Sequence, residues 1–376
     1  MSQEFGRVSA GAETAMEGEA AASDLQALLR LVITNKGSDL HLTAGSPPVI
    51  RIDGKLRKVD GYDRLEPPAI RQMIYAVLTQ RQRERLEQEM ELDLSLSLPG
   101  EARFRVNVYF QRDALGAAFR LIPTSIKGVT ELGLPEQVAR FAELPRGLVL
   151  VTGPTGNGKT TTLAALIDII NNKRELHIMT VEDPIEFLHL HNKSIVNQRE
   201  VGTDTKSFSN ALRHVLRQDP DVILVGEMRD LETISTALTA AETGHLVFAT
   251  LHTQDAPQSI DRIIDVFPPY QQQQVRVQLA GSLQGVVTQQ LVIKADGRGR
   301  TVAAEILVAT PAVRNLIREA KTHQIYSAMQ AGGRYGMQTM DQSLAGLVDR
   351  GKISFQTASE RCHDLEEFKR LAGKTG

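Results

Sequence analysis

The hydrophobic pattern of the first third of the chain is mixed. Between residues 23 and 35 apolar residues recur at helical spacing, which predicts an amphipathic helix capped by Ser23 or Asp24. Residues 38–59 alternate apolar and polar, which is typical of short strands joined by turns. A helical pattern over 67–91 and further strands over 92–122 follow. These elements predict an α+β domain over residues 23–122.

The pattern changes at Gly147, where apolar strands begin to alternate with amphipathic helices. Such alternation predicts an α/β fold with a parallel sheet and right-handed crossovers. Three prolines punctuate residues 123–146, which are therefore expected to form a linker with a short helix. We expect a core domain over 147–310 and a helical region over 311–376.

Composition limits the classes of protein that fit. The 376 residues are enough for two or three domains, and the formal net charge of −2 argues against a dedicated nucleic-acid binder. A single cysteine, Cys362, excludes disulfides within the chain and cysteine-based zinc clusters. No apolar run is long enough to span a membrane. Residues 1–22 lack the features of a signal peptide and are rich in Ala, Gly, Glu and Ser, so we expect a disordered leader and a cytosolic location.

The segment after the first strand of the core domain has the pattern G-x-x-x-x-G-K-T. Glycines at 153, 156 and 158 allow the backbone to curl so that its N–H groups face phosphate oxygens. Lys159 would reach the outer phosphates, and the Thr160 hydroxyl would ligate Mg²⁺. A chance glycine-rich turn is the alternative, but the flanking strand and helix favour a nucleoside triphosphate. The predicted ATP-binding segment is Gly153, Pro154, Thr155, Gly156, Asn157, Gly158, Lys159, Thr160 and Thr161.

Acidic residues follow two strands of the predicted sheet. Glu227 ends the strand that begins near Val222, where nucleotide hydrolases need a carboxylate for the metal shell or for water. The sequence VEDPIEF places Glu182, Asp183 and Glu186 after the preceding strand. These carboxylates either form a solvated turn or take part in water activation and metal contact, and their position favours the second interpretation.

Histidines and arginines supply further candidates. His245 precedes a strand and His252 follows it, so they cannot both bind one metal ion without a sharp fold-back. Either histidine could sense the γ-phosphate or could be an ordinary core residue. Arg105 and Arg120, on predicted strands of the first domain, could stabilise transferred phosphoryl charge or form solvated ion pairs.

The segments GPTGNGKT, VEDPIEF, LVGEMRD and TGHLVFATLHT occur in this order. Together they resemble the secretion ATPases of the type II/type IV pilus superfamily, most closely the pilus retraction (twitching motility) ATPases of the PilT family. The resemblance covers about residues 23–360. It implies an N-terminal PAS-like domain, a RecA-like ATPase core and a helical C-terminal portion. It also implies a homo-hexamer at the cytoplasmic base of the pilus machine, peripheral to the inner membrane, with an inner-membrane platform protein as its partner.

The resemblance assigns roles residue by residue. Glu186 matches the catalytic glutamate of the acidic box and Glu227 the Walker B glutamate, which also contacts Mg²⁺ with Thr160. Nucleotide is expected between the two domains, where Arg105 and Arg120 would reach its phosphates. His245 and His252 match the histidine box. Asn157 stands where relatives often carry Ser, and we expect it to contribute mainly its backbone.

A segment near the C-terminus resembles a motif needed for retraction rather than for hydrolysis. Its apolar spacing predicts a helix with Val313, Leu316 and Ile317 inward and Arg314 and Arg318 outward. The segment consists of Ala312, Val313, Arg314, Asn315, Leu316, Ile317, Arg318 and Glu319.

The sequence therefore predicts an Mg²⁺-dependent ATPase motor for pilus retraction. The lack of a tetracysteine zinc module favours retraction over pilus assembly. An accessory or regulatory pilus ATPase remains the alternative. A nucleic-acid translocase with a RecA-like core is disfavoured by the neutral charge and by the lack of basic stretches with aromatic residues.

Overall fold

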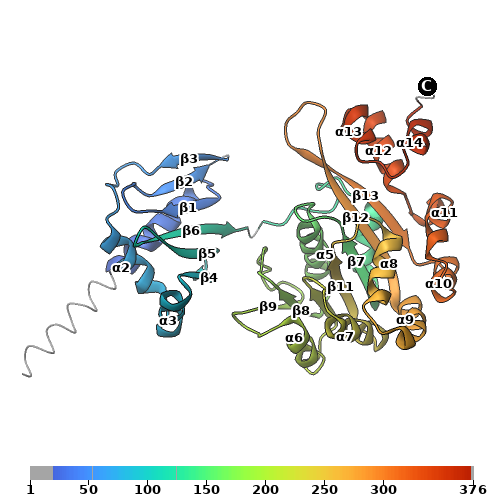
Figure 1. The fold of residues 1–376 in the computed structure, drawn as a ribbon, viewed down its shortest axis with the longest axis horizontal. Helices are drawn as coiled ribbons and strands as arrows, with labels where there is room; N and C mark the ends of the chain where they lie inside the picture. Colours follow the sequence, from blue (N-terminus) through green and yellow to red (C-terminus); the bar gives the residue numbers. More distant parts are fainter. Residues whose placement is uncertain (1–19, 53, 124, 374–376) are drawn as a thin grey trace, which may run out of the picture. The chain divides into compact units, whose positions relative to one another are not determined.

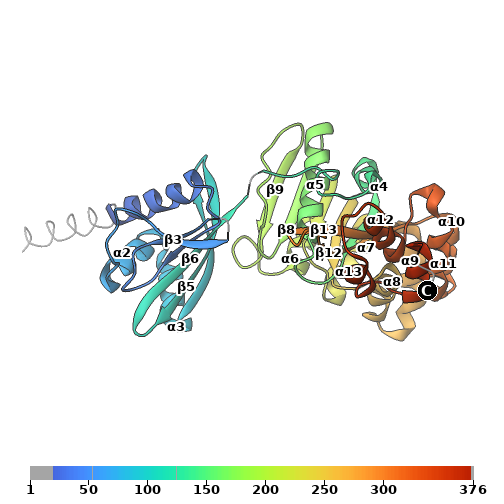
Figure 2. The same ribbon diagram turned by 90° about the horizontal axis from the view of Figure 1, so that it is seen from above.

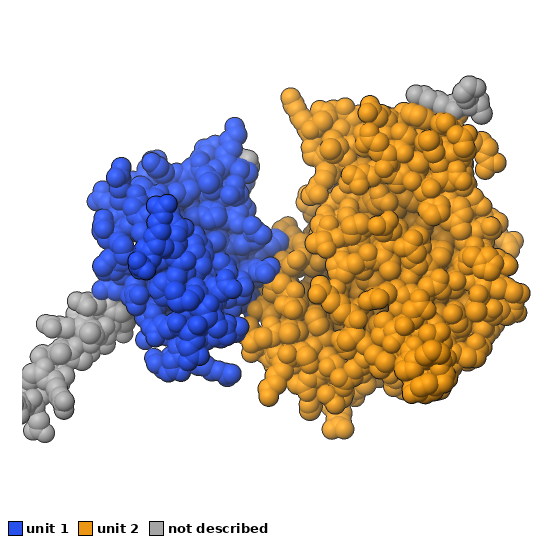
Figure 3. Space-filling model, in the orientation of Figure 1, with its two compact units in different colours: residues 1–124 blue, residues 125–376 orange. Residues whose placement is uncertain are grey.

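The computed structural model describes residues 20–373 except 53 and 124, and it divides the chain into two compact units between Thr124 and Ser125 (Figure 3). Residues 1–19 of the predicted leader lie outside the described residues. We describe each unit by itself.

Unit 1 is built on one antiparallel sheet of six strands in the order β3-β2-β1-β6-β5-β4 (Figure 1). A helix over residues 20–34 and the helix α2 (Pro67–Val77) bury their apolar faces in the same core as the inward side chains of the sheet. This agrees with the expected α+β architecture. The strands are β1 (Asp39–Leu42), β2 (Val49–Ile52), β3 (Lys55–Lys58), β4 (Glu91–Leu98), β5 (Ala102–Gln111) and β6 (Ala114–Ile122).

Two boundaries in unit 1 differ from the prediction. The first helix already includes residues 20–22, which the prediction places in the disordered leader, because Ala21 continues its buried stripe and is only 8% exposed. The predicted helix over 67–91 is two helices, α2 (Pro67–Val77) and α3 (Gln80–Glu89). Thr79 caps α3 by accepting from the Gln82 backbone while the Gln82 side chain accepts from the Thr79 backbone, and this reciprocal cap begins a new helix.

Unit 2 contains a seven-stranded sheet in the order β13-β12-β7-β11-β10-β8-β9. Six strands are parallel, and only the edge strand β13 runs antiparallel to its neighbour β12. The alternation of strand and helix predicted the parallel strands β7, β8, β10 and β11, whereas β9, β12 and β13 were not anticipated. The strands are β7 (Gly147–Thr152), β8 (His177–Glu182), β9 (Ile195–Glu200), β10 (Val222–Val225), β11 (Leu246–Leu251), β12 (Leu283–Ile293) and β13 (Arg300–Val308).

Helices cover both faces of this sheet and form two separate cores. One core includes apolar residues of α6, α7, α8, α9 and α10 (Pro311–Arg318), and the other includes those of α5 (Figures 1 and 2). The α/β fold class with a P-loop core is thus confirmed. The helices are α5 (Lys159–Lys173), α6 (Phe208–Val215), α7 (Leu231–Glu242), α8 (Ala256–Asp265) and α9 (Pro269–Ser282).

The segment predicted as a linker, residues 123–146, is mostly part of the second unit. Its helices α4 (Glu136–Arg140) and η1 (Phe141–Glu143) lie together, and η1 packs against α5. Val129, Leu134 and Val138 are buried in the same core as strand β7, because this face of the sheet would otherwise be open to water. Only the first residues of the segment connect the units.

The C-terminal region is helical, as expected. Its α10 packs on α9 and its α12 packs on β13, so the region shares the compact unit of the sheet. Within the described residues no helix is long and apolar enough to cross a membrane. The elements are α10 (Pro311–Arg318), η2 (Thr322–Gln324), α11 (Ile325–Gln330), η3 (Gly333–Tyr335), α12 (Met340–Asp349), α13 (Phe355–Ser359) and α14 (Leu365–Leu371).

One side chain of α10 departs from the prediction. Val313 and Ile317 are buried as expected, but Arg314 does not point outward. Its guanidinium donates to the backbone oxygens of Ala280 (2.6 Å) and Gly281 (2.8 Å), near the end of α9. The carbonyl groups at the end of a helix lack intrahelical partners and carry partial negative charge, and this attracts the arginine. Arg314 therefore fastens α10 to α9.

Gly285 provides a test of how tightly the supposed linker packs. A Cβ at this position would lie 2.3 Å from the ring of Phe141 and 2.8 Å from the Leu307 carbonyl oxygen. Gly285→Ala should therefore lower the free energy of unfolding of unit 2 by about 2 kcal/mol. Gly281→Ala is the matched control in α9, because a Cβ there would have nothing within 4 Å. It should leave stability unchanged or raise it by up to about 1 kcal/mol. Urea unfolding measures both, and equal effects would contradict the proposed packing.

Candidate functional site

The phosphate-binding loop joins the centre of the sheet to helix α5. Strand β7 is completely buried and ends at Thr152, and α5 begins at Lys159. Gly153 has a φ of +133°, and a Cβ there would lie 2.4 Å from the Gln289 carbonyl oxygen, so only glycine fits. Gly158 caps the helix in the left-handed conformation. The chain thus has the strand, turn and helix that the motif requires.

Strand β12 holds this loop in place from the side. The Asn157 side-chain oxygen accepts a hydrogen bond from the Leu291 backbone N–H at 2.7 Å. The buried amide of Gln289 donates to Thr162 Oγ1 at 2.9 Å, which fixes the first turn of α5. Asn157 therefore contributes its side chain as well as its backbone, contrary to expectation. A strand that comes more than a hundred residues later in the sequence shapes the loop.

The Lys159 side chain curls back over the loop. It is only 8% exposed, and its Nζ donates to the carbonyl oxygens of Gly153 (2.8 Å) and Pro154 (3.1 Å). Burial lowers the pKa of Lys159, and the nearby carboxylates of Glu227 and Glu186 oppose that shift. The ammonium group is thus held at the mouth of the loop, close to two acidic side chains.

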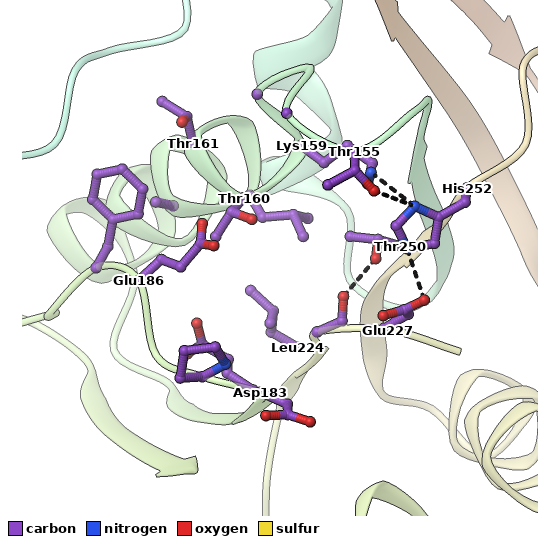
Figure 4. Close-up of a pocket in the computed structure, with 18 of the residues that line it drawn as sticks. Thr155, Lys159, Thr160, Thr161, Asp183, Glu186, Leu224, Glu227, Thr250 and His252 are labelled. Atoms are coloured by element: carbon purple, nitrogen blue, oxygen red, sulfur yellow. Dashed lines mark hydrogen bonds and ion pairs between the residues drawn. The ribbon is translucent and has the colours of Figure 1, made fainter. Parts of the chain in front are cut away.

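A pocket of about 470 Å³ opens where the loop meets the carboxyl ends of β8, β10 and β11 (Figure 4). Ligands of open α/β sheets bind at this edge. The pocket includes six of the nine residues predicted to bind nucleotide; Gly153, Pro154 and Asn157 do not line it. The lining residues with the clearest chemical capacity are Thr155, Lys159, Thr160, Thr161, Glu182, Asp183, Glu186, Glu227, Arg229 and His252.

His252 connects the two sides of this pocket. Its Nε2 lies 2.7 Å from the Glu227 carboxylate, and its Nδ1 lies 3.4 Å from Thr155 Oγ1 in the phosphate-binding loop. Arg229 forms a further ion pair with Glu227. One carboxylate is therefore shared by an imidazole and a guanidinium. Reasoning from the sequence missed Arg229, although a cation two residues after Glu227 was a visible signal.

The acidic box supplies one buried carboxylate, Glu182, and two exposed ones, Asp183 and Glu186, and all three line the pocket. Glu182 accepts from Thr180 Oγ1 (2.6 Å) and Gln198 Nε2 (3.1 Å), and its burial raises its pKa. The Gln198 amide also donates to the Phe187 carbonyl oxygen, which holds the loop that follows. Glu186 lies on this loop and is exposed, across the pocket from Glu227 (Figure 4). Glu182 thus supports the loop, and Glu186 is placed to meet a ligand.

His245 is not brought to the pocket. It precedes β11 and lies at the opposite end of that strand from His252. Its Nδ1 lies 3.0 Å from the Ala240 carbonyl oxygen at the end of α7. Within the chain the two histidines of the box therefore have different surroundings, and a phosphate-sensing role for His245 stays a prediction.

Arg105 and Arg120 belong to the sheet of unit 1. They are directly opposite each other on β5 and β6, and both are exposed. Arg120 Nε donates to the Asp39 carboxylate at 2.8 Å. Burial of Asp39 works to raise its pKa, but hydrogen bonds from Ser38 and Arg120 outweigh it and hold that pKa below its usual value. Contact of the two arginines with a nucleotide stays a prediction, since the two units are described separately.

Comparison with known proteins gives the family. The model of the family described as "Type II/IV secretion system protein" matches residues 15–297. The chain belongs to this family. It is 53% identical to the type IV pilus retraction ATPase PilT of Pseudomonas aeruginosa over 345 residues, which cover 92% of this chain and all of that protein. It is 41% identical to the type IV pilus ATPase PilU of the same organism, over 94% of this chain and 93% of that protein.

A solved structure supports the same assignment. The crystal structure of the pilus retraction motor PilT with bound ADP matches with a TM-score of 0.84 and 50% identity. The match covers 91% of this chain and 98% of that one. The chain is thus a nucleotide-binding ATPase of the PilT branch, and the resemblance inferred from its motifs is confirmed.

The support from β12 can be tested at Asn157. Asn157→Ala removes the acceptor for the Leu291 N–H. This should destabilise the ordered conformation of the loop by about 1 kcal/mol and thereby weaken ADP binding about fivefold. Titration with a fluorescent ADP analogue measures this effect. Asn172→Ala, which removes an exposed amide at the other end of α5, is the control and should bind as the unmodified chain does. Identical affinities of the two variants would show that β12 does not order the loop.

Proposed function

We propose that this ATPase is a hexameric, Mg²⁺-dependent motor that powers retraction of a type IV pilus. The observation that carries the proposal is the pocket itself. It gathers the phosphate-binding loop, Glu186, Glu227 and His252 at one edge of the sheet. The similarity to PilT over nearly the full length of both chains supports the biological role.

Magnesium fits the residues present at this site. In the part of the chain that the structure describes, no group of three His, Cys, Asp or Glu could hold a metal ion. Thr160 lines the pocket in the first turn of α5, so a metal ion would be held by its hydroxyl, by phosphate oxygens and by water. The Glu227 carboxylate already has the Arg229 guanidinium and the His252 imidazole as partners, and this favours contact with the metal through water. The ion would neutralise charge on the phosphates.

The side chains around the pocket divide the work of hydrolysis. Lys159 would hold the outer phosphates, because its ammonium group already lies over the loop. Glu186 is exposed across the pocket and would orient and activate the attacking water. His252 bridges Thr155 and Glu227, so a change at the γ-phosphate would alter its hydrogen bonds. His252 would thereby sense the state of the nucleotide, while Glu227 helps to position metal and water.

The arginines of unit 1 support a role in domain closure. Like charges directly opposite each other on a sheet repel, and the Asp39 carboxylate that offsets this charge is paired with Arg120 and Arg51. An anion bound against Arg105 and Arg120 would relieve the repulsion between them. The transferred phosphoryl group is such an anion, and its release would let unit 1 move. In a hexamer this movement would be passed from subunit to subunit.

We infer that the motor works in the cytoplasm at the inner membrane, against a platform protein of the pilus machine. The exposed part of the retraction motif would make that contact: Ala312, Asn315, Arg318 and Glu319. An accessory pilus ATPase remains the second candidate, and the higher identity to PilT than to PilU disfavours it. In cells that lack the gene, abundant pili without twitching would support retraction, and cells without pili would refute it.

The role of the acidic box can be tested at Glu186. Glu186→Ala should lower kcat for ATP hydrolysis about 100-fold or more, because it removes the group that activates water, and should leave ADP affinity nearly unchanged. Lys159→Ala is the contrasting variant and should lose nucleotide binding as well. Steady-state phosphate release and ADP titration separate the two effects. A Glu186→Ala variant with the unmodified rate would show that the assignment is wrong.

The two arginines of α10 should behave differently. Arg318 is exposed, so Arg318→Ala should keep stability and ATP hydrolysis and abolish twitching. Arg314→Ala removes hydrogen bonds to the end of α9 and should lower the free energy of unfolding by about 2 kcal/mol. Thermal unfolding, phosphate release and a twitching assay measure these effects. Loss of hydrolysis in Arg318→Ala would place this residue in the catalytic machinery instead.

A further inference from the structure

A buried carboxylate, Glu305, lies where the ATPase core meets the C-terminal helices. It is on the edge strand β13 and is only 2% exposed. Its carboxylate accepts a hydrogen bond from the backbone N–H of Ala256 at 2.8 Å and another from the backbone N–H of Met340. Ala256 is the first residue of α8, and Met340 is the first residue of α12. One side chain therefore joins the N-termini of two helices.

Groups of both signs of charge surround the Glu305 carboxylate and have opposite effects on its ionisation. The N-termini of α8 and α12 have positive partial charge and favour a carboxylate. Asp255 caps α8 and Asp341 is in the first turn of α12, so both place negative charge close to Glu305. Burial, reinforced by these two carboxylates, raises the pKa of Glu305 to about 7. His363, on the loop before α14, and Asp261 of α8 are the further charged groups close to Asp255.

Helix α8 connects this carboxylate to the nucleotide pocket. The loop that leads into α8 begins at His252, the residue paired with Glu227. Thr253 Oγ1 lies 2.6 Å from Ser259 Oγ, and Ser259 Oγ lies 3.5 Å from the hydroxyl of Thr152, the last residue before the phosphate-binding loop. The first turn of α8 is therefore joined to Thr253, the residue that follows His252, and to the end of β7.

The other side of Glu305 is joined to the C-terminal helices. Ile306 and Gln338 exchange two backbone hydrogen bonds, at 2.9 and 3.1 Å. The Ala304 N–H donates to Ser343 Oγ at 3.0 Å. Asp341 then accepts from the backbone N–H of His363 at 2.6 Å, at the entrance to α14. The start of α12 is thus fixed to β13 on both sides of Glu305.

We propose that Glu305 is a positioning residue for ATP hydrolysis: it holds the start of α8 so that His252 meets Glu227, and it joins this loop to the C-terminal helices α12 and α14. The inference rests on the proposed function, since it assigns the control of His252 within the same site. It gives the C-terminal helices a physical route to the nucleotide.

A double-mutant cycle on the full chain tests the proposal. Glu305→Gln keeps the shape of the side chain but offers one carbonyl oxygen to two N–H groups. It should lower kcat about tenfold with ADP affinity within about twofold, because misplacement of a group that acts at the reacting phosphate affects turnover more than binding. In a His252→Ala background the same change should have no further effect on kcat. Asp349→Asn, at the exposed far end of α12, is the control and should keep the unmodified rate.

Thermal unfolding against pH separates positioning from simple structural support. In the folded chain the pKa of Glu305 is raised, so the residue stays protonated at pH values where the unfolded chain, with a pKa of about 4.5, has already lost the proton. The stability of the unmodified chain therefore falls as pH rises from about 4.5 towards 7. Glu305→Gln has no such cost. Its Tm at pH 8 should equal or exceed that of the unmodified chain although its kcat is lower.

Three results would overturn the inference: an unmodified kcat in Glu305→Gln, a full tenfold loss also in the His252→Ala background, or a lower Tm at pH 8. Failure of the proposed function gives a different result. In that case the unmodified chain would hydrolyse ATP no faster than Lys159→Ala, whatever residue stands at position 305.

Discussion

The contact between the phosphate-binding loop and strand β12 determines the geometry of the whole site. Gly153 approaches the Gln289 backbone so closely that no side chain fits, and Asn157 is hydrogen-bonded to Leu291. The loop is thus clamped between the central strand β7 and its neighbour. Because a P-loop binds phosphate with backbone N–H groups, its affinity depends on a backbone that is already in the right shape. The contacts with β12 fix this loop conformation before nucleotide binds.

Around this loop the acidic and basic side chains are held by ion pairs and hydrogen bonds within the protein. Glu227 is shared by His252 and Arg229, and Lys159 is held by carbonyl oxygens of its own loop. A triphosphate brings several negative charges into this arrangement and competes for the same cations. These pairs are therefore the ones expected to rearrange during the catalytic cycle, while the hydrogen bonds of Glu182 keep the acidic loop in place.

The two units contribute in different ways. Unit 2 contains a complete P-loop pocket, supported from both faces of its sheet by separate cores. Unit 1 contributes a row of charged residues across its sheet, with Asp39 between Arg51 and Arg120 in direct register and Arg105 next in line. Three guanidinium groups and one carboxylate give this row of unit 1 a net positive charge.

The sequence by itself determined the fold class, the phosphate-binding loop and the family, because these depend on local patterns: a buried strand, three glycines, a lysine and acidic residues at fixed spacing. Local patterns also predicted most helices of unit 2. They failed where a contact with a distant segment decides the outcome. Ala21 extends a helix because it packs into a core, and Phe141 belongs to unit 2 because it lies against Gly285.

Only the tertiary structure decided which side chains meet. It paired His252 with Glu227, turned Arg314 towards the end of α9, and placed Glu305 between two helices that begin far apart in the sequence. Such contacts depend on strand order and helix packing, and neither can be predicted from the spacing of residues along the chain. The phosphate-binding loop and its lysine can thus be recognised from the sequence, whereas the side-chain contacts around them are set by the tertiary structure.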